Sequence, residues 1–112
     1  MKLRALVILA AMPLLAGCAR KTLATSELYK TYCARCHGRE GRGDPRHLAR
    51  YPHLDLRSSP MVRRGDRPAV RQRIAEGDGP MPGFSHRLTP QEIERLVDFT
   101  FQLVPSPHKE NP

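Results

Sequence analysis

Two cysteines and a histidine at residues 33–37 constrain the fold of this 112-residue chain more than any other feature. Cys33 and Cys36 are three residues apart, and His37 follows directly. On a helix, two such sulfurs lie on one face about one turn apart. C-x-x-C-H is the pattern of covalent haem attachment, in which each sulfur forms a thioether to a porphyrin vinyl group and the histidine becomes the proximal iron ligand. The motif therefore predicts one haem c on Cys33, Cys36 and His37.

Two other chemistries use a C-x-x-C pair. A thioredoxin-type redox motif belongs in a βαβ context, and the sequence shows no run of strands. A zinc site would need further ligands, with His47 or His53 as candidates, but there is no second C-x-x-C pair. Aromatic residues are few, with three Tyr, three Phe and no Trp. Because so short a chain buries little apolar surface alone, a buried porphyrin would complete the core, and we favour haem.

The start of the chain has the order of an export signal. Lys2 and Arg4 precede an apolar stretch at residues 5–11, and Leu15, Ala16 and Gly17 lead to Cys18. The stretch is shorter than the roughly 20 residues of a membrane span. Its end resembles the lipobox of bacterial lipoproteins, in which cleavage before the cysteine leaves it to be lipidated. An ordinary signal peptide with a stray cysteine, or an uncleaved anchor, is the alternative.

These features divide the chain into four parts. We predict a lipoprotein signal peptide at 1–17, a lipidated linker at 18–24, one cytochrome domain at 25–105 and a disordered tail at 106–112. With Cys18 lipidated and the other two cysteines carrying haem, no disulfide remains. The predicted location is the cell envelope, lipid-anchored and facing the periplasm.

The domain is predicted to be mostly helix and loop. A first helix starts at Thr25 or Ser26 as a cap, and glycines from Gly38 onward end it. Residues 38–66 have no sustained period and form a long loop. A second helix follows Asp66 as a cap and stops at Gly77.

The last helix is the best marked. Thr89 and Glu92 form a T-x-x-E capping box, and Pro90 takes the first helical position. The apolar face is then spaced by three and four residues. Its members are Ile93, Leu96, Val97, Thr100, Phe101 and Val104. Pro105 ends the helix.

A constrained segment at residues 77–84 precedes this helix. It contains three glycines and two prolines, which exclude helix and central strand. Pro80 and Pro82 fix φ on both sides of Met81, and the glycines let backbone approach a flat ring closely. The segment could therefore present the Met81 thioether to iron. The candidates for a second axial ligand are Met61, Met81, His47, His53, His86 and His108.

With the C-x-x-C-H motif on its first helix, the chain resembles small monohaem class I cytochromes c. The resemblance extends through Gly38 and the segment around Met81 to the final helix. It implies an all-α, cytochrome c-like fold with three or so helices and long loops around one haem. It also implies that the first and last helices cross, so that Tyr29 or Tyr32 packs against a residue of the last helix. The expected partners there are Leu96, Val97 and Phe101.

The same resemblance assigns further site residues. It selects Met81 as the distal iron ligand. It also implies a proline carbonyl that accepts the ring N–H of His37. Residues 52–54 look like the Pro-x-Leu segment that does this, with Pro52 as the acceptor and Leu54 touching the porphyrin. Pro45 is the alternative acceptor.

An iron with both axial positions filled has no open site for a substrate. We therefore expect an electron-transfer protein and not an enzyme, without catalytic residues or a small-molecule substrate. The net charge of +8 favours redox partners with acidic docking surfaces or anionic lipid head groups, or is simply an Arg-rich solvated surface. Aromatic and basic residues are not interleaved, which argues against nucleic acid. The alternatives are a haem-carrying subunit of a larger oxidoreductase, and a sensor or peroxidase-like domain with an open distal site.

Overall fold

The computed structural model describes residue 17 and residues 21–104. The elements of regular structure among these residues are α-helices and 3₁₀ helices. Within these residues there is no strand, and only an isolated bridge joins Asp78 to Met81. The predicted all-α fold is confirmed. Cys18, His108, the tail at 106–112 and nearly all of the proposed signal lie outside the described residues. The elements are α1 (Thr25–Tyr32), α2 (Ala34–His37), the 3₁₀ helices η1 (Pro52–Leu54) and η2 (Leu56–Ser58), α3 (Pro60–Arg63), α4 (Arg67–Glu76) and α5 (Pro90–Leu103).

The haem motif lies on a helix with a break in it. α1 ends at Tyr32 and α2 starts at Ala34, with Cys33 between them at φ −117° and ψ −41°. Backbone bonds cross the break, because Cys33 N donates to Tyr29 O at 2.8 Å and His37 N donates to Cys33 O at 2.9 Å. The motif therefore keeps a nearly helical backbone.

The predicted cap of α1 is wrong. Thr25 and Ser26 lie inside the helix, and Ala24 occupies the cap position without a side-chain bond. The Thr25 hydroxyl instead lies 3.4 Å from Nη1 of Arg95. A tertiary partner on α5 thus takes the hydroxyl that local reasoning assigned to the cap.

The caps of α4 and α5 are confirmed. A carboxylate oxygen of Asp66 accepts from Ala69 N at 3.1 Å, and α4 ends at Gly77 with φ +73°. At α5, Thr89 N donates to the Glu92 carboxylate at 2.9 Å, and Glu92 N donates to the Thr89 hydroxyl at 3.1 Å. A cap of this kind contributes about 1 kcal/mol to helix stability.

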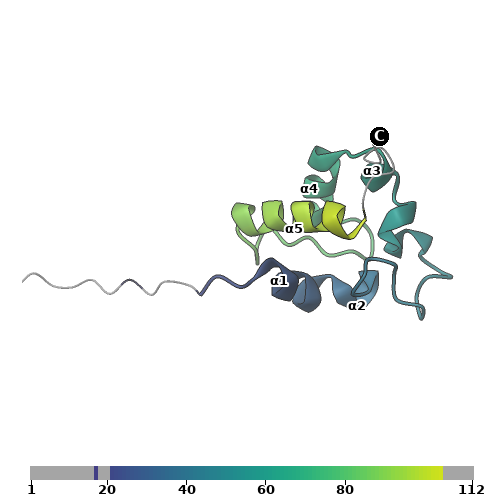
Figure 1. Cartoon of the computed structure of the whole chain (residues 1–112), viewed down its shortest axis with the longest axis horizontal. Coiled ribbons are helices and arrows are strands. Elements are labelled where there is room, and N and C mark those ends of the chain that lie inside the picture. Colours follow the sequence, from purple (N-terminus) through teal and green to yellow (C-terminus); the bar gives the residue numbers. More distant parts are fainter. Residues whose placement is uncertain (1–16, 18–20, 105–112) are drawn as a thin grey trace, which may run out of the picture.

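α5 is the central helix of the domain. It packs against α1 on one side and α4 on the other, and the chain between α4 and α5 runs beside α5 (Figure 1). The predicted contact between the first and last helices is thus confirmed. Tyr29 shares the buried core with Leu96 and Val97, and its ring also meets that of Phe99, which was not among the predicted partners, at a centroid distance of 5.0 Å. The buried core comprises Leu28, Tyr29, Val62, Val70, Ile74, Phe84, Leu88, Ile93, Leu96, Val97 and Val104.

The stretch predicted as a loop at residues 38–66 contains η1, η2 and α3. Two carboxylates organise its turns: Asp44 accepts from Arg46 N at 2.8 Å and Asp55 accepts from Arg57 N at 2.9 Å. Elements of three or four residues are too short to produce a readable hydrophobic period, which is why the sequence did not reveal them. None of the helices in the described part of the chain is long and apolar enough to cross a membrane.

Candidate haem-binding site

The two cysteines differ in exposure. Cys33 is half-buried against the core, whereas Cys36 is exposed, and both thiols are free. Burial, with a smaller contribution from Cys36, raises the pKa of the Cys33 thiol to about 12. Cys33 is therefore protonated at neutral pH, and the edge of the motif that faces solvent is the one at Cys36.

His37 is oriented by the chain that follows it. Its Nδ1–H donates to the backbone carbonyl of Leu54 at 2.9 Å. Burial lowers the pKa of His37 below its ordinary value, and the bond to Leu54 opposes this shift more weakly. The imidazole is thus kept neutral, with Nε2 as the ring nitrogen left to bind a metal.

The predicted acceptor for His37 is wrong. The Pro52 carbonyl accepts from Asp55 N at 3.2 Å and from the Ser58 hydroxyl at 2.9 Å, so it is used within the 3₁₀ turns. The carbonyl at the end of η1, that of Leu54, points to the histidine instead. Pro45, the alternative, is not the acceptor either. The acceptor lies in the predicted segment 52–54, but it is the third residue of that segment and not the first.

The chain after His37 returns to the motif and closes it. Gly43 N donates to His37 O at 2.7 Å and Asp44 N donates to Cys36 O at 2.8 Å. The Tyr29 hydroxyl donates to Gly38 O at 2.7 Å. Burial is the largest cause of a raised pKa of Tyr29, so this phenol stays protonated and able to donate. These bonds fix the end of α2, and reasoning from sequence missed all of them.

Met81 is held in a tight turn against the end of α4. Asp78 N donates to Met81 O and Met81 N donates to Asp78 O, each at 3.0 Å. Gly77 has φ +73° and ψ −175°, and a Cβ there would lie 2.4 Å from Met81 O. Downstream, Phe84 N donates to Ile74 O at 3.0 Å, which pins the segment to the helix. The Met81 backbone therefore has little freedom.

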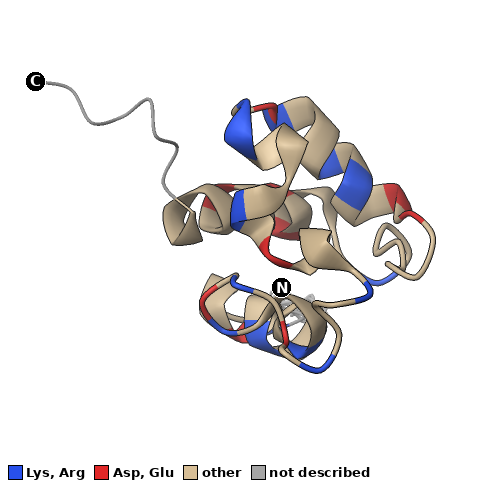
Figure 2. Cartoon of the chain, turned by 90° about the vertical axis from the view of Figure 1, so that its right-hand side faces the viewer, with Lys and Arg blue, Asp and Glu red and all other residues tan. Residues whose placement is uncertain are grey.

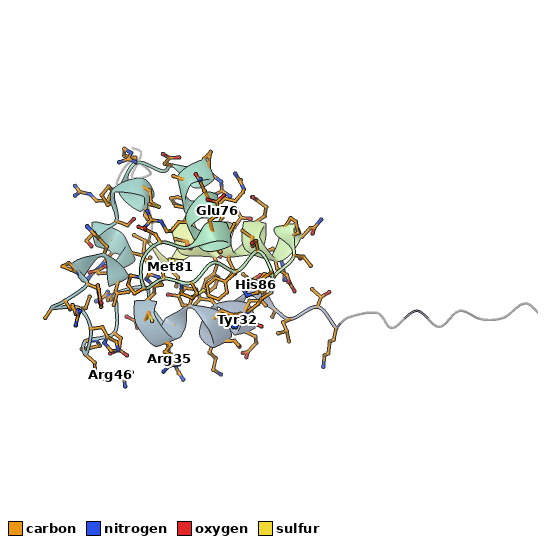
Figure 3. The ribbon with its side chains drawn as sticks, turned by 180° about the vertical axis from the view of Figure 1, so that it is seen from behind. Tyr32, Arg35, Arg46, Glu76, Met81 and His86 are labelled. Carbon is orange, nitrogen blue, oxygen red and sulfur yellow. The ribbon has the colours of Figure 1, made fainter. Side chains whose placement is uncertain are left out.

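The Met81 side chain is half-buried and packs against the core. In the view of Figure 3 it lies between the ribbons of α4 and α2. Met61, on α3, is also half-buried against the core. The three described histidines other than His37 are exposed, namely His47, His53 and His86. Among the candidates for a second axial ligand, the structure thus separates two half-buried thioethers from exposed imidazoles.

The donor set and its surroundings fit a haem. Two thiols, a neutral imidazole with a free Nε2 and a thioether are the groups by which proteins hold haem and its iron. Apolar side chains from several elements pack on the core but stay partly exposed, and two of these donors are among them. These apolar side chains include Tyr32, Cys33, Ala34, Leu56, Met61 and Met81. In the described chain no three His, Cys, Asp or Glu side chains gather as a metal site, so the zinc interpretation gains no support.

The comparison with protein families decides between these chemistries. A family model described as cytochrome C oxidase, cbb3-type, subunit III matches residues 21–99. The chain belongs to this family of c-type cytochromes. A search of curated proteins finds no match. The cytochrome domain covers the motif, the Met81 segment and most of α5, and family membership assigns it haem-based electron transfer.

Proposed function

We propose that this cytochrome carries one covalent haem c with His37 and Met81 as axial ligands, and that it passes single electrons between partners in the cell envelope. The observation that carries the proposal is the pairing of two fixed donors. His37 is oriented by the Leu54 carbonyl, and Met81 is fixed by its reciprocal bonds to Asp78. A group that gains and loses an electron with little rearrangement needs such fixed ligands.

Each residue has a separate task in this proposal. Cys33 and Cys36 hold the porphyrin through thioethers, and Leu54 orients the His37 ring through its carbonyl while its side chain contacts the porphyrin. The bound haem supplies an iron that changes oxidation state by one electron. A thioether at Met81 favours the reduced state and raises the potential relative to a second histidine. With both axial positions filled, no position is left for a substrate.

The second ligand is tested by the visible spectrum of the oxidised protein. Methionine bound to ferric haem gives a weak charge-transfer band in the far red. We expect Met81→Ala to lose this band and Met61→Ala to keep it, since the two methionines are similarly half-buried. A band that survives in Met81→Ala would refute the ligand assignment. A wild-type protein that lacks the band and binds carbon monoxide would favour the sensor or peroxidase-like alternative.

The tether is the second part of the proposal. A lipid on Cys18 would confine the domain to a membrane surface on the periplasmic side and raise its effective concentration near membrane-bound partners. Cys18→Ser is expected to move the protein from the membrane fraction to the soluble envelope fraction. Membrane association unchanged by this substitution would contradict lipid anchoring.

A larger oxidoreductase complex is the second candidate function. The family description, a subunit of a cbb3-type oxidase, favours it. Mild detergent extraction followed by affinity purification of the tagged full-length chain separates the two. An oxidase core that copurifies in a fixed ratio would support a subunit, whereas a haem protein that elutes alone would support a shuttle.

A further inference from the structure

A pair of aromatic rings joins the helix of the C-x-x-C-H motif to the segment that carries Met81. Tyr32, the last residue of α1, lies directly before Cys33. Its ring meets that of Phe84 edge to face, with the centroids 5.7 Å apart and the planes inclined at 62°. Such a pair stabilises by more than the burial of its apolar area alone. The contact therefore links the end of α1 to the chain just beyond Met81.

The two parts of the chain that this pair joins belong to different layers of the domain. Figure 2, like Figure 1, shows α1 and α2 on one side of α5 and α4 on the other. His37 ends α2, whereas the Met81 turn follows α4. Two donors on different layers keep a fixed separation only when side chains between the layers hold them together. Contacts between the two layers therefore help to set the distance between His37 and Met81.

Phe84 transmits the contact to Met81 through the backbone. Its ring is 5 % exposed and belongs to the buried core, and the half-buried Tyr32 packs on the same core. Phe84 N donates to Ile74 O at 3.0 Å, and Leu88 N donates to Phe84 O at 2.8 Å. In the view of Figure 3 the segment that follows Met81 runs past Tyr32. A displacement of the Phe84 ring would accordingly move this segment.

We propose that Tyr32 is a positioning residue, whose ring holds the Met81 segment closed so that the thioether stays on the iron. This inference rests on the proposed function, because it takes Met81 as the distal ligand. The Tyr32 ring acts through Phe84, and its hydroxyl is not needed, since it forms no hydrogen bond with any residue that the structure describes. Met81 must leave the iron before an added ligand can bind there, and its segment then moves away from α1. The ring pair is lost in that open state and therefore favours the closed one.

Imidazole, a small ligand of ferric haem, competes with Met81 and so measures this preference. The far-red band falls as imidazole replaces the thioether, which gives an apparent Kd. The matched variants are Tyr32→Leu and Phe99→Leu, because each removes the half-buried ring of a pair whose other ring is buried. The partner of Phe99 is Tyr29, so this second pair joins α5 to α1 and not to the Met81 segment.

The expected effect follows from the loss of one ring pair, which corresponds to roughly fivefold in an equilibrium constant. Tyr32→Leu should therefore bind imidazole about fivefold more tightly than the wild type. Phe84→Leu removes the same pair from the other side and should give the same gain. Phe99→Leu should stay within about 1.5-fold of the wild type, because its pair persists in both states. Tyr32→Phe keeps the ring and should match the wild type.

The results that would overturn the proposal are distinct from a failure of the ligand assignment. An affinity for imidazole that neither Tyr32→Leu nor Phe84→Leu raises would overturn it, and so would an equal gain in Phe99→Leu, since general loosening of the domain would then explain both. A Tyr32→Phe variant that behaves like Tyr32→Leu would assign the effect to the hydroxyl and overturn it as well. A wild-type protein without the far-red band would refute Met81 as ligand, and this inference with it. The haem content of each preparation is first confirmed by the visible spectrum, so that a failure of haem attachment is seen separately.

Discussion

Gly77→Ala tests how the Met81 turn is built. Gly77 has φ +73° and ψ −175°, a region of backbone space that is essentially restricted to glycine. A Cβ at this position would also lie 2.4 Å from Met81 O and 2.6 Å from Gly83 N, both backbone atoms. Alanine therefore introduces backbone strain and forces the Met81 turn to move.

The size of the effect follows from these two terms. Backbone strain of this type costs roughly 1–3 kcal/mol, and the clash adds the cost of displacing the turn, so that we expect a loss of at least about 3 kcal/mol. Gly79→Ala is the matched control, because Gly79 has φ +54° but nothing within 4 Å of its added Cβ. The control should lose about 1 kcal/mol from the left-handed backbone alone.

Thermal unfolding of the oxidised haem protein measures both variants. For a domain of this size 1 kcal/mol corresponds to about 4–8 °C in Tm. Gly77→Ala should thus lower Tm by at least about 12 °C and weaken the far-red methionine band, whereas Gly79→Ala should lower Tm by about 4–8 °C with the band intact. Equal Tm values for the two variants, with both bands intact, would refute the account of the turn.

Three further substitutions test the framework around the site. Tyr29→Phe removes the 2.7 Å hydrogen bond to Gly38 O and should lower the free energy of unfolding in urea by about 1–2 kcal/mol. A loss below about 0.3 kcal/mol would contradict a stabilising role of this bond. Thr89→Ala removes half of the α5 capping box and should cost about 1 kcal/mol by the same assay, and an unchanged midpoint would show that the box is not needed. Hydrogen bonds from Arg46 hold the pKa of Asp44 well below its usual range. The ionised Asp44 therefore stabilises the folded protein fully above about pH 4, and this contribution declines as the pH falls toward the pKa of the folded state. Asp44→Asn should make the free energy of unfolding less dependent on pH below about pH 4. A pH dependence equal to that of the wild type would argue against this linkage.

The elements predicted correctly from sequence are those with local chemical signals. Asp66 and Gly77 bound α4, and the Thr89 box starts α5, because caps and helix stops depend on neighbouring residues alone. The C-x-x-C-H motif likewise indicated haem, and family membership in the c-type cytochromes bears this out. Local chemistry was enough in each case.

The errors fall where tertiary contacts decide. Thr25 was predicted as a cap but meets Arg95 of α5, which is 70 positions away. Phe99 was not named on the apolar face of α5, and its ring meets that of Tyr29 on α1. The acceptor of the His37 N–H is set by the 3₁₀ turns before it, and those turns have no readable period. No local pattern carries this information.

The mass of the purified mature protein after denaturation tests the central claim most directly. We predict a covalent adduct of one haem on a peptide that contains Cys33 and Cys36, resistant to acid-acetone extraction. Cys36→Ala, which removes one thioether, should shift the reduced alkaline pyridine spectrum toward that of haem with one free vinyl group. A protein with the mass of the bare chain, or one whose haem is extracted by acid-acetone, would contradict the claim.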